Sequence, residues 1–154
     1  MELYIKKFTE LTLDELYDII KLRIDVFIVE QKCPYHEADG IDKDAVHLFI
    51  KEEGKIIAYL RIMDRGIESE YVSIGRVIAA KRRCGLGSKL LSEGIKTAQE
   101  LFGADTIYLE AQTYAEPFYI KAGFKRVSDE FDIDGIPHIK MLLTIVNNLP
   151  STTD

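Results

Sequence analysis

Apolar residues recur at helical spacing near the start of the chain. Thr12 and Glu15 have the spacing of a capping box, and Leu11 and Leu16 have that of a hydrophobic staple around it. The apolar residues that continue this period are Leu16, Ile19, Ile20, Ile24 and Phe27. Because residues three and four apart share one face of a helix, the pattern predicts a first helix with one buried side.

Runs rich in β-branched residues then predict strands. Residues 46–50 and 55–62 are two such runs, and Glu53 and Gly54 lie between them as a turn signal. This arrangement predicts a β-hairpin. Residues 71–80 form a further run of the same kind and predict another strand.

The second half of the chain alternates helix and strand patterns. A glycine-containing turn at 82–87 opens a second amphipathic helix, and Gly103 is placed to end it. The remaining predicted elements are a strand at 106–112, a short helix at 116–122 stopped by Gly123, hairpin arms at 125–131 and 138–146 around the turn 134–137, and a frayed tail at 147–154. This order predicts a single α+β domain over residues 1–146 with mixed sheet pairing.

Length and composition limit the classes of protein to which the chain can belong. Its 154 residues suit one domain, and 47% hydrophobic with 30% charged residues is typical of a soluble globular protein. No apolar run approaches a membrane span, and residues 1–8 are too short for a secretory signal, so we expect a cytoplasmic location and no membrane partner. The net charge of −6 argues against nucleic-acid binding. A homodimer remains open.

The strongest chemical signal is the segment from Arg82 to Ser88, Arg-Arg-Cys-Gly-Leu-Gly-Ser, between a predicted strand and a predicted helix. Glycines at Gly85 and Gly87 permit close approach of the backbone. Amides of the loop and of the first helical turn can then bind a phosphate, helped by the helix dipole and by the arginines. The alternative is a tight turn in which the glycines serve only sterics.

Two other phosphate-binding motifs are excluded by spacing. A P-loop requires Gly-Lys-Ser/Thr, whereas Gly87 is followed by Ser88 and Lys89. A dinucleotide-binding fingerprint would require a glycine at Leu90 and an acidic residue at the end of the next strand, whereas Asp105 precedes that strand.

These residues resemble the GNAT superfamily of N-acetyltransferases. Its pyrophosphate motif, Gln/Arg-x-x-Gly-x-Gly/Ala, is matched by Arg82, Gly85 and Gly87. Its later helix pattern is matched by Ala115, Phe118, Tyr119, Gly123 and Phe124. The chain departs from the superfamily at Gln112, where many members have Asn, and at Ala79, where many have Pro. The resemblance implies a mostly antiparallel, mixed central sheet flanked by helices.

A narrower resemblance is to the ElaA-like branch of the superfamily. The matching segments are Val26-Phe27, Val29-Glu30-Gln31, Cys33-Pro34-Tyr35, Asp39-Gly40, Gly75-Arg76-Val77 and 134–138. This match extends the resemblance to the first predicted helix. It does not name an acceptor.

The resemblance also implies a cofactor and roles for individual residues. Acetyl-CoA would be the co-substrate, with the Val77 amide as oxyanion donor and Tyr119 as the acid for the departing thiolate. The residues implied to contact the cofactor are Val77, Ile78, Ala79, Arg82, Arg83, Cys84, Gly85, Leu86, Gly87, Ser88, Gln112 and Phe118. Without the resemblance, Tyr119 could equally be a half-buried packing residue.

An amine attacks only when it is unprotonated, so the reaction needs a proton acceptor. Glu110, near the end of a predicted strand, is the first candidate, and Glu30 is the second; either could instead be a solvated carboxylate. The residues expected to line the acceptor cleft are Glu30, Tyr35, Arg76 and His138. No His, Cys or acidic spacing favours a metal, and the histidines could equally serve structural hydrogen bonds.

The two cysteines suggest neither a disulfide nor an acyl-enzyme. Cys84 lies inside the phosphate-loop motif, which suits direct transfer, and Cys33 is expected to pack or to line the cleft. The leading hypothesis is therefore direct acetyl transfer to an amine of a small molecule or peptide. The competing hypothesis is a CoA-binding regulatory or interaction module without turnover.

Overall fold

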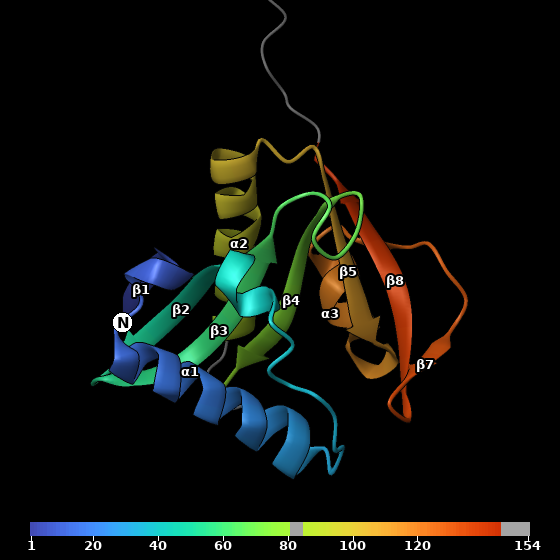
Figure 1. The fold of residues 1–154 in the computed structure, drawn as a ribbon. Coiled ribbons are helices and arrows are strands. Elements are labelled where there is room, and N and C mark those ends of the chain that lie inside the picture. The colour runs from blue at the N-terminus through green and yellow to red at the C-terminus, as the bar shows by residue number, and fades with distance from the viewer. Residues whose placement is uncertain (81–84, 146–154) are drawn as a thin grey trace, which may run out of the picture.

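The computed structural model describes residues 1–80 and 85–145, which form a mixed sheet with helices on both faces (Figure 1). Strand order along the sheet is β1-β2-β3-β4-β5-β8-β6, with β7 paired to β8 outside this path. All neighbouring pairs are antiparallel except β4 with β5. The expected α+β class, with a mostly antiparallel sheet flanked by helices, is confirmed.

The elements follow the order that the sequence pattern predicts, with additions at both ends. The strands are β1 (Glu2–Lys7), β2 (Val46–Glu52), β3 (Lys55–Met63), β4 (Val72–Ala79), β5 (Thr106–Gln112), β6 (Lys125–Arg126), β7 (Phe131–Ile133) and β8 (Ile136–Thr144). The α-helices are α1 (Leu13–Ile24), α2 (Leu86–Phe102) and α3 (Glu116–Lys121). Short 3-10 or π turns are η1 (Phe8–Glu10), η2 (Asp25–Glu30), η3 (Ile41–Asp44) and η4 (Thr113–Ala115).

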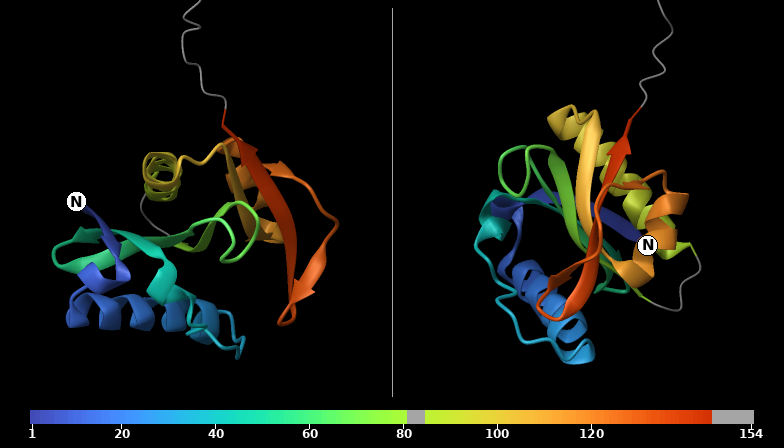
Figure 2. Two further views of the ribbon diagram at one scale, coloured as in Figure 1. Left: turned by 45° about the horizontal axis from the view of Figure 1, so that its top comes forward. Right: turned by 90° about the vertical axis from the view of Figure 1, so that its right-hand side faces the viewer.

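Successive side chains of β2 point to opposite faces of the sheet. Leu48 and Ile50 belong to the main core with α2, whereas Phe49 packs with Ile19 of α1 in a smaller cluster on the other face. Figure 2 shows α1 and α2 on opposite sides of the sheet. Helix α2 lies close to β3, because a Cβ at Gly94 would stand 2.7 Å from a methyl carbon of Leu60.

The sheet opens between its two parallel strands. β4 and β5 pair only at Val72 with Ile107 and at Ser73 with Tyr108. Beyond these pairs the register of β3 with β4 shifts, and Arg76 takes a left-handed φ of 54°. A bulge of this kind bends a strand and increases its twist. The two strands therefore separate toward their C-terminal ends, as Figure 1 shows.

Two predictions about the elements need correction. The sequence pattern assigned no strand to residues 2–7, yet β1 pairs with β2 along its whole length as an edge strand. The expected arm at 125–131 is split into β6 and β7, because Ser128 Oγ accepts from the Lys140 N–H at 2.9 Å where a ladder carbonyl would otherwise stand. β8 begins at Ile136, so the connecting turn is shorter than expected.

Within the described residues, no helix is both long and apolar enough to cross a membrane. The expected tail at 147–154 and the basic end of the loop motif at 81–84 lie outside the described residues. The cytoplasmic location and the homodimer stay predictions.

Candidate active site

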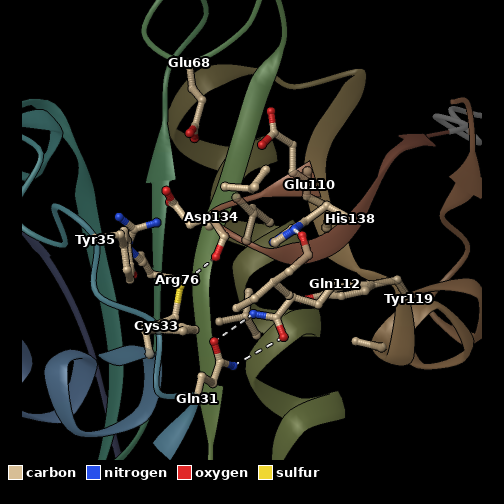
Figure 3. Close-up of a pocket in the computed structure, with 18 of the residues that line it drawn as sticks. Gln31, Cys33, Tyr35, Glu68, Arg76, Glu110, Gln112, Tyr119, Asp134 and His138 are labelled. Carbon is tan, nitrogen blue, oxygen red and sulfur yellow. Dashed lines mark hydrogen bonds between the residues drawn. The ribbon is translucent and has the colours of Figure 1, made fainter. Parts of the chain in front are cut away.

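A cavity of about 320 Å³ lies where β4 and β5 separate (Figure 3). Its walls come from η2 and the segment after it, from β4 and β5, from the start of α3 and from the β7–β8 turn. Seven of the residues to which the sequence analysis gave a catalytic, cofactor-binding or acceptor-binding role line it, namely Tyr35, Arg76, Val77, Glu110, Gln112, Tyr119 and His138. The fold thus brings together residues that are far apart in the sequence.

Some predicted site residues lie elsewhere. Glu30 is exposed at the end of η2 and is not among the residues that line the cavity, so its place in the acceptor cleft stays a prediction. The side chains of Ile78 and Leu86 are buried, Leu86 within the main core, which leaves only their backbone for a ligand. Ala79 packs against the same core, and Arg82, Arg83 and Cys84 are outside the described residues.

Tyr119 combines burial with access to the cavity. It lies on α3 and is 8% exposed, with its ring edge-on to Phe118 at 5.1 Å and to Phe124 at 5.9 Å between centroids. Burial raises the pKa of the Tyr119 hydroxyl, with a smaller contribution from Tyr114. The phenol therefore stays protonated at neutral pH and can act as a proton donor.

Arg76 and Val77 form the bulge of β4 opposite a single residue of β3. The side chain of Arg76 is held by Glu37, whose Oε2 accepts from Nε at 2.6 Å, and stacks over the ring of Tyr35 at 5.3 Å. An arginine at positive φ is uncommon, and here surrounding contacts fix it. A bulge takes a residue out of the regular hydrogen-bond ladder, so the amide of that residue can face the cavity instead of the neighbouring strand.

Beneath Arg76 lies a buried network of arginines and carboxylates. Arg23 is 0% exposed and pairs with Glu37 and, at 2.7 Å, with Asp42. Arg61 is 1% exposed and donates to Asp39 at 2.7 Å and to Asp42 at 3.0 Å. This network connects α1 with the segment 37–42 and with β3. Arg76 contacts it through Glu37 and Asp39.

The arginines keep Asp39 and Asp42 ionised. Burial alone would raise the pKa of Asp39, but the hydrogen bond and charge of Arg61, the Ile41 amide and the charge of Arg76 outweigh it and lower that pKa to about 2. The pKa of Asp42 is likewise lowered, because Arg23 and Arg61 outweigh the effect of its burial. The network is thus a set of charged pairs at neutral pH.

Glu110 stands on β5 with its carboxylate open to solvent and to the cavity. The hydroxyl of Tyr108 donates to Glu110 Oε1 at 2.9 Å. Desolvation raises the pKa of Tyr108, and the hydrogen bond and charge of Glu110 raise it further, so Tyr108 remains a donor. This contact orients one oxygen of Glu110 and leaves the other for a substrate.

Sequence reasoning missed Glu68, which precedes β4 and lines the same cavity. Its Oε2 would lie 3.9 Å from a Cβ built on Gly75 of β4. Surrounding protein raises the pKa of Glu68 by desolvation, and the negative charge of Glu110 also raises it, whereas Arg61 opposes the shift. No local pattern marks this residue, because the path of the loop 64–71 alone brings it to the cavity.

The opposite end of the cavity is closed by a pair of glutamines (Figure 3). Gln31 and Gln112 exchange two amide hydrogen bonds, of 3.3 and 3.1 Å, across a separation of 81 residues. Nearby, the buried Cys33 thiol donates to the carbonyl of Asp134 at 3.1 Å. Cys33 therefore lines the cleft, as expected, and its thiol is engaged in a hydrogen bond.

His138 has a defined tautomer. Its Nδ1 lies 2.7 Å from the carbonyl oxygen of Ile136, and because a carbonyl only accepts, Nδ1 carries the proton. In the neutral ring Nε2 is then an acceptor. His138 also faces Gln112 in the register of β5 with β8, which places it on the β8 wall of the cavity.

The N-terminus of α2 provides donors for an anion. Gly85 is its N-cap at a φ of 78°, no side chain caps it among the described residues, and the first turn has no acidic residue. A Cβ at Gly87 would lie 3.3 Å from the ring of Phe118. Gly85 thus supplies a left-handed turn, and Gly87 allows a close approach of α2 to α3. Both glycines therefore also have a local steric role, in addition to any contact with a ligand.

A groove of about 470 Å³ continues from this helix start between α2 and α3. It is lined by Ser88 and Phe118 together with the lysines Lys96 and Lys121. Amides at the helix start and ammonium groups along the groove both favour phosphate groups, so these residues fit a coenzyme A ligand. No cluster of three or more His, Cys, Asp or Glu side chains suited to a metal ion occurs in residues 1–80 and 85–145.

The relatives of the chain agree with this geometry. Residues 16–145 match the acetyltransferase (GNAT) domain family. A UPF0039 protein of Schizosaccharomyces pombe is 42% identical over 94% of this chain and 98% of its own length. ElaA of Escherichia coli is 36% identical over 90% of this chain and 93% of its own length. A solved acyl-CoA N-acyltransferase of Pseudomonas aeruginosa has 38% identity and a TM-score of 0.87, covering 94% of this chain and 100% of that chain. The chain therefore belongs to the GNAT acetyltransferase family and to its ElaA-like branch.

Proposed function

We propose that this protein transfers an acetyl group from acetyl-CoA directly to a primary amine of a small molecule or peptide, within a ternary complex. The observation that carries the proposal is one cavity that holds both a buried, protonated Tyr119 and the open carboxylate of Glu110. A proton donor and a proton acceptor on different walls suit a reaction that moves one proton off the amine and one onto the leaving group.

The α2 N-terminus and the α2–α3 groove are the proposed coenzyme A site. The amides of the first turn would bind the pyrophosphate, and Lys96 and Lys121 would contribute positive charge along the groove. Acetyl-CoA, when bound, supplies an acetyl group activated as a thioester. Gln112, where many relatives have Asn, is held by Gln31 beside the opening between β4 and β5.

Three residues of the chain have roles in the proposed transfer. Glu110 takes a proton from the acceptor ammonium, so that the free amine can form the new C–N bond. The second proton that the nitrogen loses as the amide forms passes to solvent. The Val77 N–H, in the bulge of β4, donates to the acyl oxygen as negative charge develops there. Tyr119 gives its proton to the sulfur as the C–S bond breaks, and solvent restores that proton.

The described residues favour direct transfer over an acyl-enzyme. Cys33 is the cysteine of the cavity, and its thiol donates to the Asp134 carbonyl rather than to a base. A nucleophilic cysteine requires an activating base or positive charge beside it. We therefore expect mass spectrometry to find no acetylated cysteine during turnover.

The test is thiol release from acetyl-CoA with a panel of primary amines, followed by mass detection of the acetylated product. Calorimetry with coenzyme A and with NAD is the binding control, and only coenzyme A should bind. Coenzyme A binding without any acetylated product would contradict the proposed acetyl transfer and favour a CoA-binding module without turnover. Failure of the folded protein to bind coenzyme A would overturn the site itself.

A further inference from the structure

The positive charges in the wall of the cavity are already neutralised. Arg61 lies between Asp39 and Asp42, and Arg76 donates to Glu37 at 2.6 Å with Asp39 at 3.5 Å. Together with Arg23 these are three arginines against three carboxylates. The network therefore adds little net charge to the cavity.

Two carboxylates of the cavity have no ion pair with a Lys or Arg among the described residues. Glu68 and Glu110 reach the cavity from facing walls, one from the loop before β4 and one from β5 (Figure 3). No ion pair with a Lys or Arg is found for either of them within residues 1–80 and 85–145. Lys140 faces Glu110 in the strand register, but its ammonium lies over the ring of Phe131 at 5.8 Å. This end of the cavity is consequently negative.

We propose that the acceptor is an amine that carries a second positive charge, and that Glu68 binds this second charge. The inference rests on the proposed function, because it names the substrate class of that transfer. Glu110 takes the proton of the reacting ammonium, and Glu68 holds the other cationic group at the same end of the cavity. A diamine, or a larger amine with two ammonium groups, has this chemistry.

The first experiment compares three acceptors of equal chain length with terminal groups of different charge: diaminobutane, aminobutanol and aminobutanoate. At neutral pH all three carry a protonated amine, so only the second group differs. We expect kcat/KM for diaminobutane to exceed the other two by about tenfold or more, since hydrogen bonds to charged groups are worth one to two decades of affinity.

The second experiment tests Glu68 itself. Glu68→Gln removes the charge and keeps the shape, and it should reduce the preference for diaminobutane over aminobutanol about tenfold. Glu70→Gln is the matched control, because Glu70 is exposed on the same loop but does not line the cavity. It should leave the preference as in the natural protein.

Calorimetry of diaminobutane with the coenzyme A-loaded protein gives a readout that needs no turnover. Binding that Glu68→Gln weakens and Glu70→Gln does not would support the cation site even if no amine were acetylated, in which case the proposed transfer alone would fail. Equal use of the three amines by an active enzyme would overturn the cation site and leave the transfer intact. Absence of diaminobutane binding, or binding independent of Glu68, would likewise overturn it.

Discussion

Tyr119 shows how the position of one residue decides its chemistry. Its ring is enclosed by Phe118 and Phe124, yet the residue lines the cavity, so the hydroxyl is desolvated and remains within reach of a ligand. Desolvation disfavours the phenolate and raises the pKa of the hydroxyl. A packing residue would need only the ring, whereas a proton donor needs the hydroxyl, and this difference can be measured.

Tyr119→Phe is predicted to lower kcat by at least about tenfold, since general acid catalysis is worth about 10²- to 10⁴-fold. The ring contacts survive, so coenzyme A affinity and Tm should stay nearly unchanged. Steady-state kinetics, calorimetry and thermal unfolding are the measurements. An acyl donor with a more acidic thiol needs less help to leave and should show a smaller defect.

Tyr114→Phe is the control for that variant. Tyr114 also lines the cavity but is 77% exposed, and the proposed reaction gives its hydroxyl no role. Its kcat should match that of the natural protein within about twofold, a change worth less than RT. A decrease in kcat of less than tenfold in Tyr119→Phe, or equal decreases in both variants, would indicate that Tyr119 serves only in packing.

At the scale of single elements, the start of α1 is fixed by contacts that the sequence encodes locally. The Thr12 hydroxyl accepts from the Glu15 N–H at 3.0 Å, and Glu15 Oε1 accepts from the Thr12 N–H at 2.9 Å. The structure adds partners from other strands, because Lys6 of β1 and Lys51 of β2 approach Glu15 at 2.8 and 3.5 Å. The capping residue thus also joins the helix to the sheet edge.

Glu15 should make the stability of the protein sensitive to acid. Burial alone would raise the pKa of Glu15, but hydrogen bonds from Lys6 and Thr12 and the charges of Lys6 and Lys51 lower it from 4.5 to about 2. A carboxyl whose pKa falls on folding stabilises the protein above the unfolded pKa. That stabilisation, on the order of 2 to 3 kcal/mol, is lost as pH falls from about 4.5 toward 2.

The measurement is urea unfolding of the natural protein and of Glu15→Gln across this pH range. The variant should be less stable at neutral pH, and the difference between the two proteins should shrink as the pH falls, because protonated Glu15 is uncharged like Gln, whereas groups that titrate in both proteins cancel in the difference. Asp14→Asn, at an exposed position in the same turn, should cost less than about 1 kcal/mol. A constant difference at every pH would contradict the prediction.

Contacts between near neighbours in the chain are those that the sequence could predict. The capping box, the Glu53-Gly54 turn and the Gly103 cap are local, and the structure confirms each of them. β1 was missed because its apolar run, Leu3 to Ile5, is only three residues long and no turn signal joins it to its partner strand. Its partner residues in β2 lie 39 to 49 residues further along the sequence.

The candidate site also contains some residues that the sequence could predict and others that it could not. The superfamily motifs located Val77 and Tyr119, and the cavity contains both. Glu68 and the Gln31–Gln112 pair were not predictable, since their positions follow from a loop path and from the order of strands rather than from spacing. Residue type alone could not separate Glu30, which faces solvent, from Glu110, which lines the cavity.

On the scale of the whole molecule, the buried network connects parts of the chain that no single element joins. Arg23 belongs to α1, Glu37 and Asp42 to the segment before β2, and Arg61 to β3. Through Glu37 the network also reaches Arg76 at the bulge of β4. The N-terminal helix is thereby linked to the strand that opens the cavity.

Arg23→Met is predicted to destabilise the protein by about 3 to 5 kcal/mol, because Arg23 is 0% exposed and its removal leaves buried carboxylates with one partner fewer. Lys21→Met is the matched control on the same helix, since its 2.8 Å ion pair with Asp25 is solvent-exposed and should contribute little to stability. Urea unfolding of the three proteins at neutral pH measures the change in the free energy of unfolding for both variants.

If Arg23→Met does not fold, Arg23→Lys is the second variant. It retains a positive charge but cannot contact Glu37 and Asp42 at the same time, so its free energy of unfolding should fall by less than that of Arg23→Met. Equal stability of Arg23→Met and Lys21→Met would mean that the network is not what joins α1 to the sheet, and the apolar contacts of Ile19 with Phe49 and Tyr59 would then carry that connection.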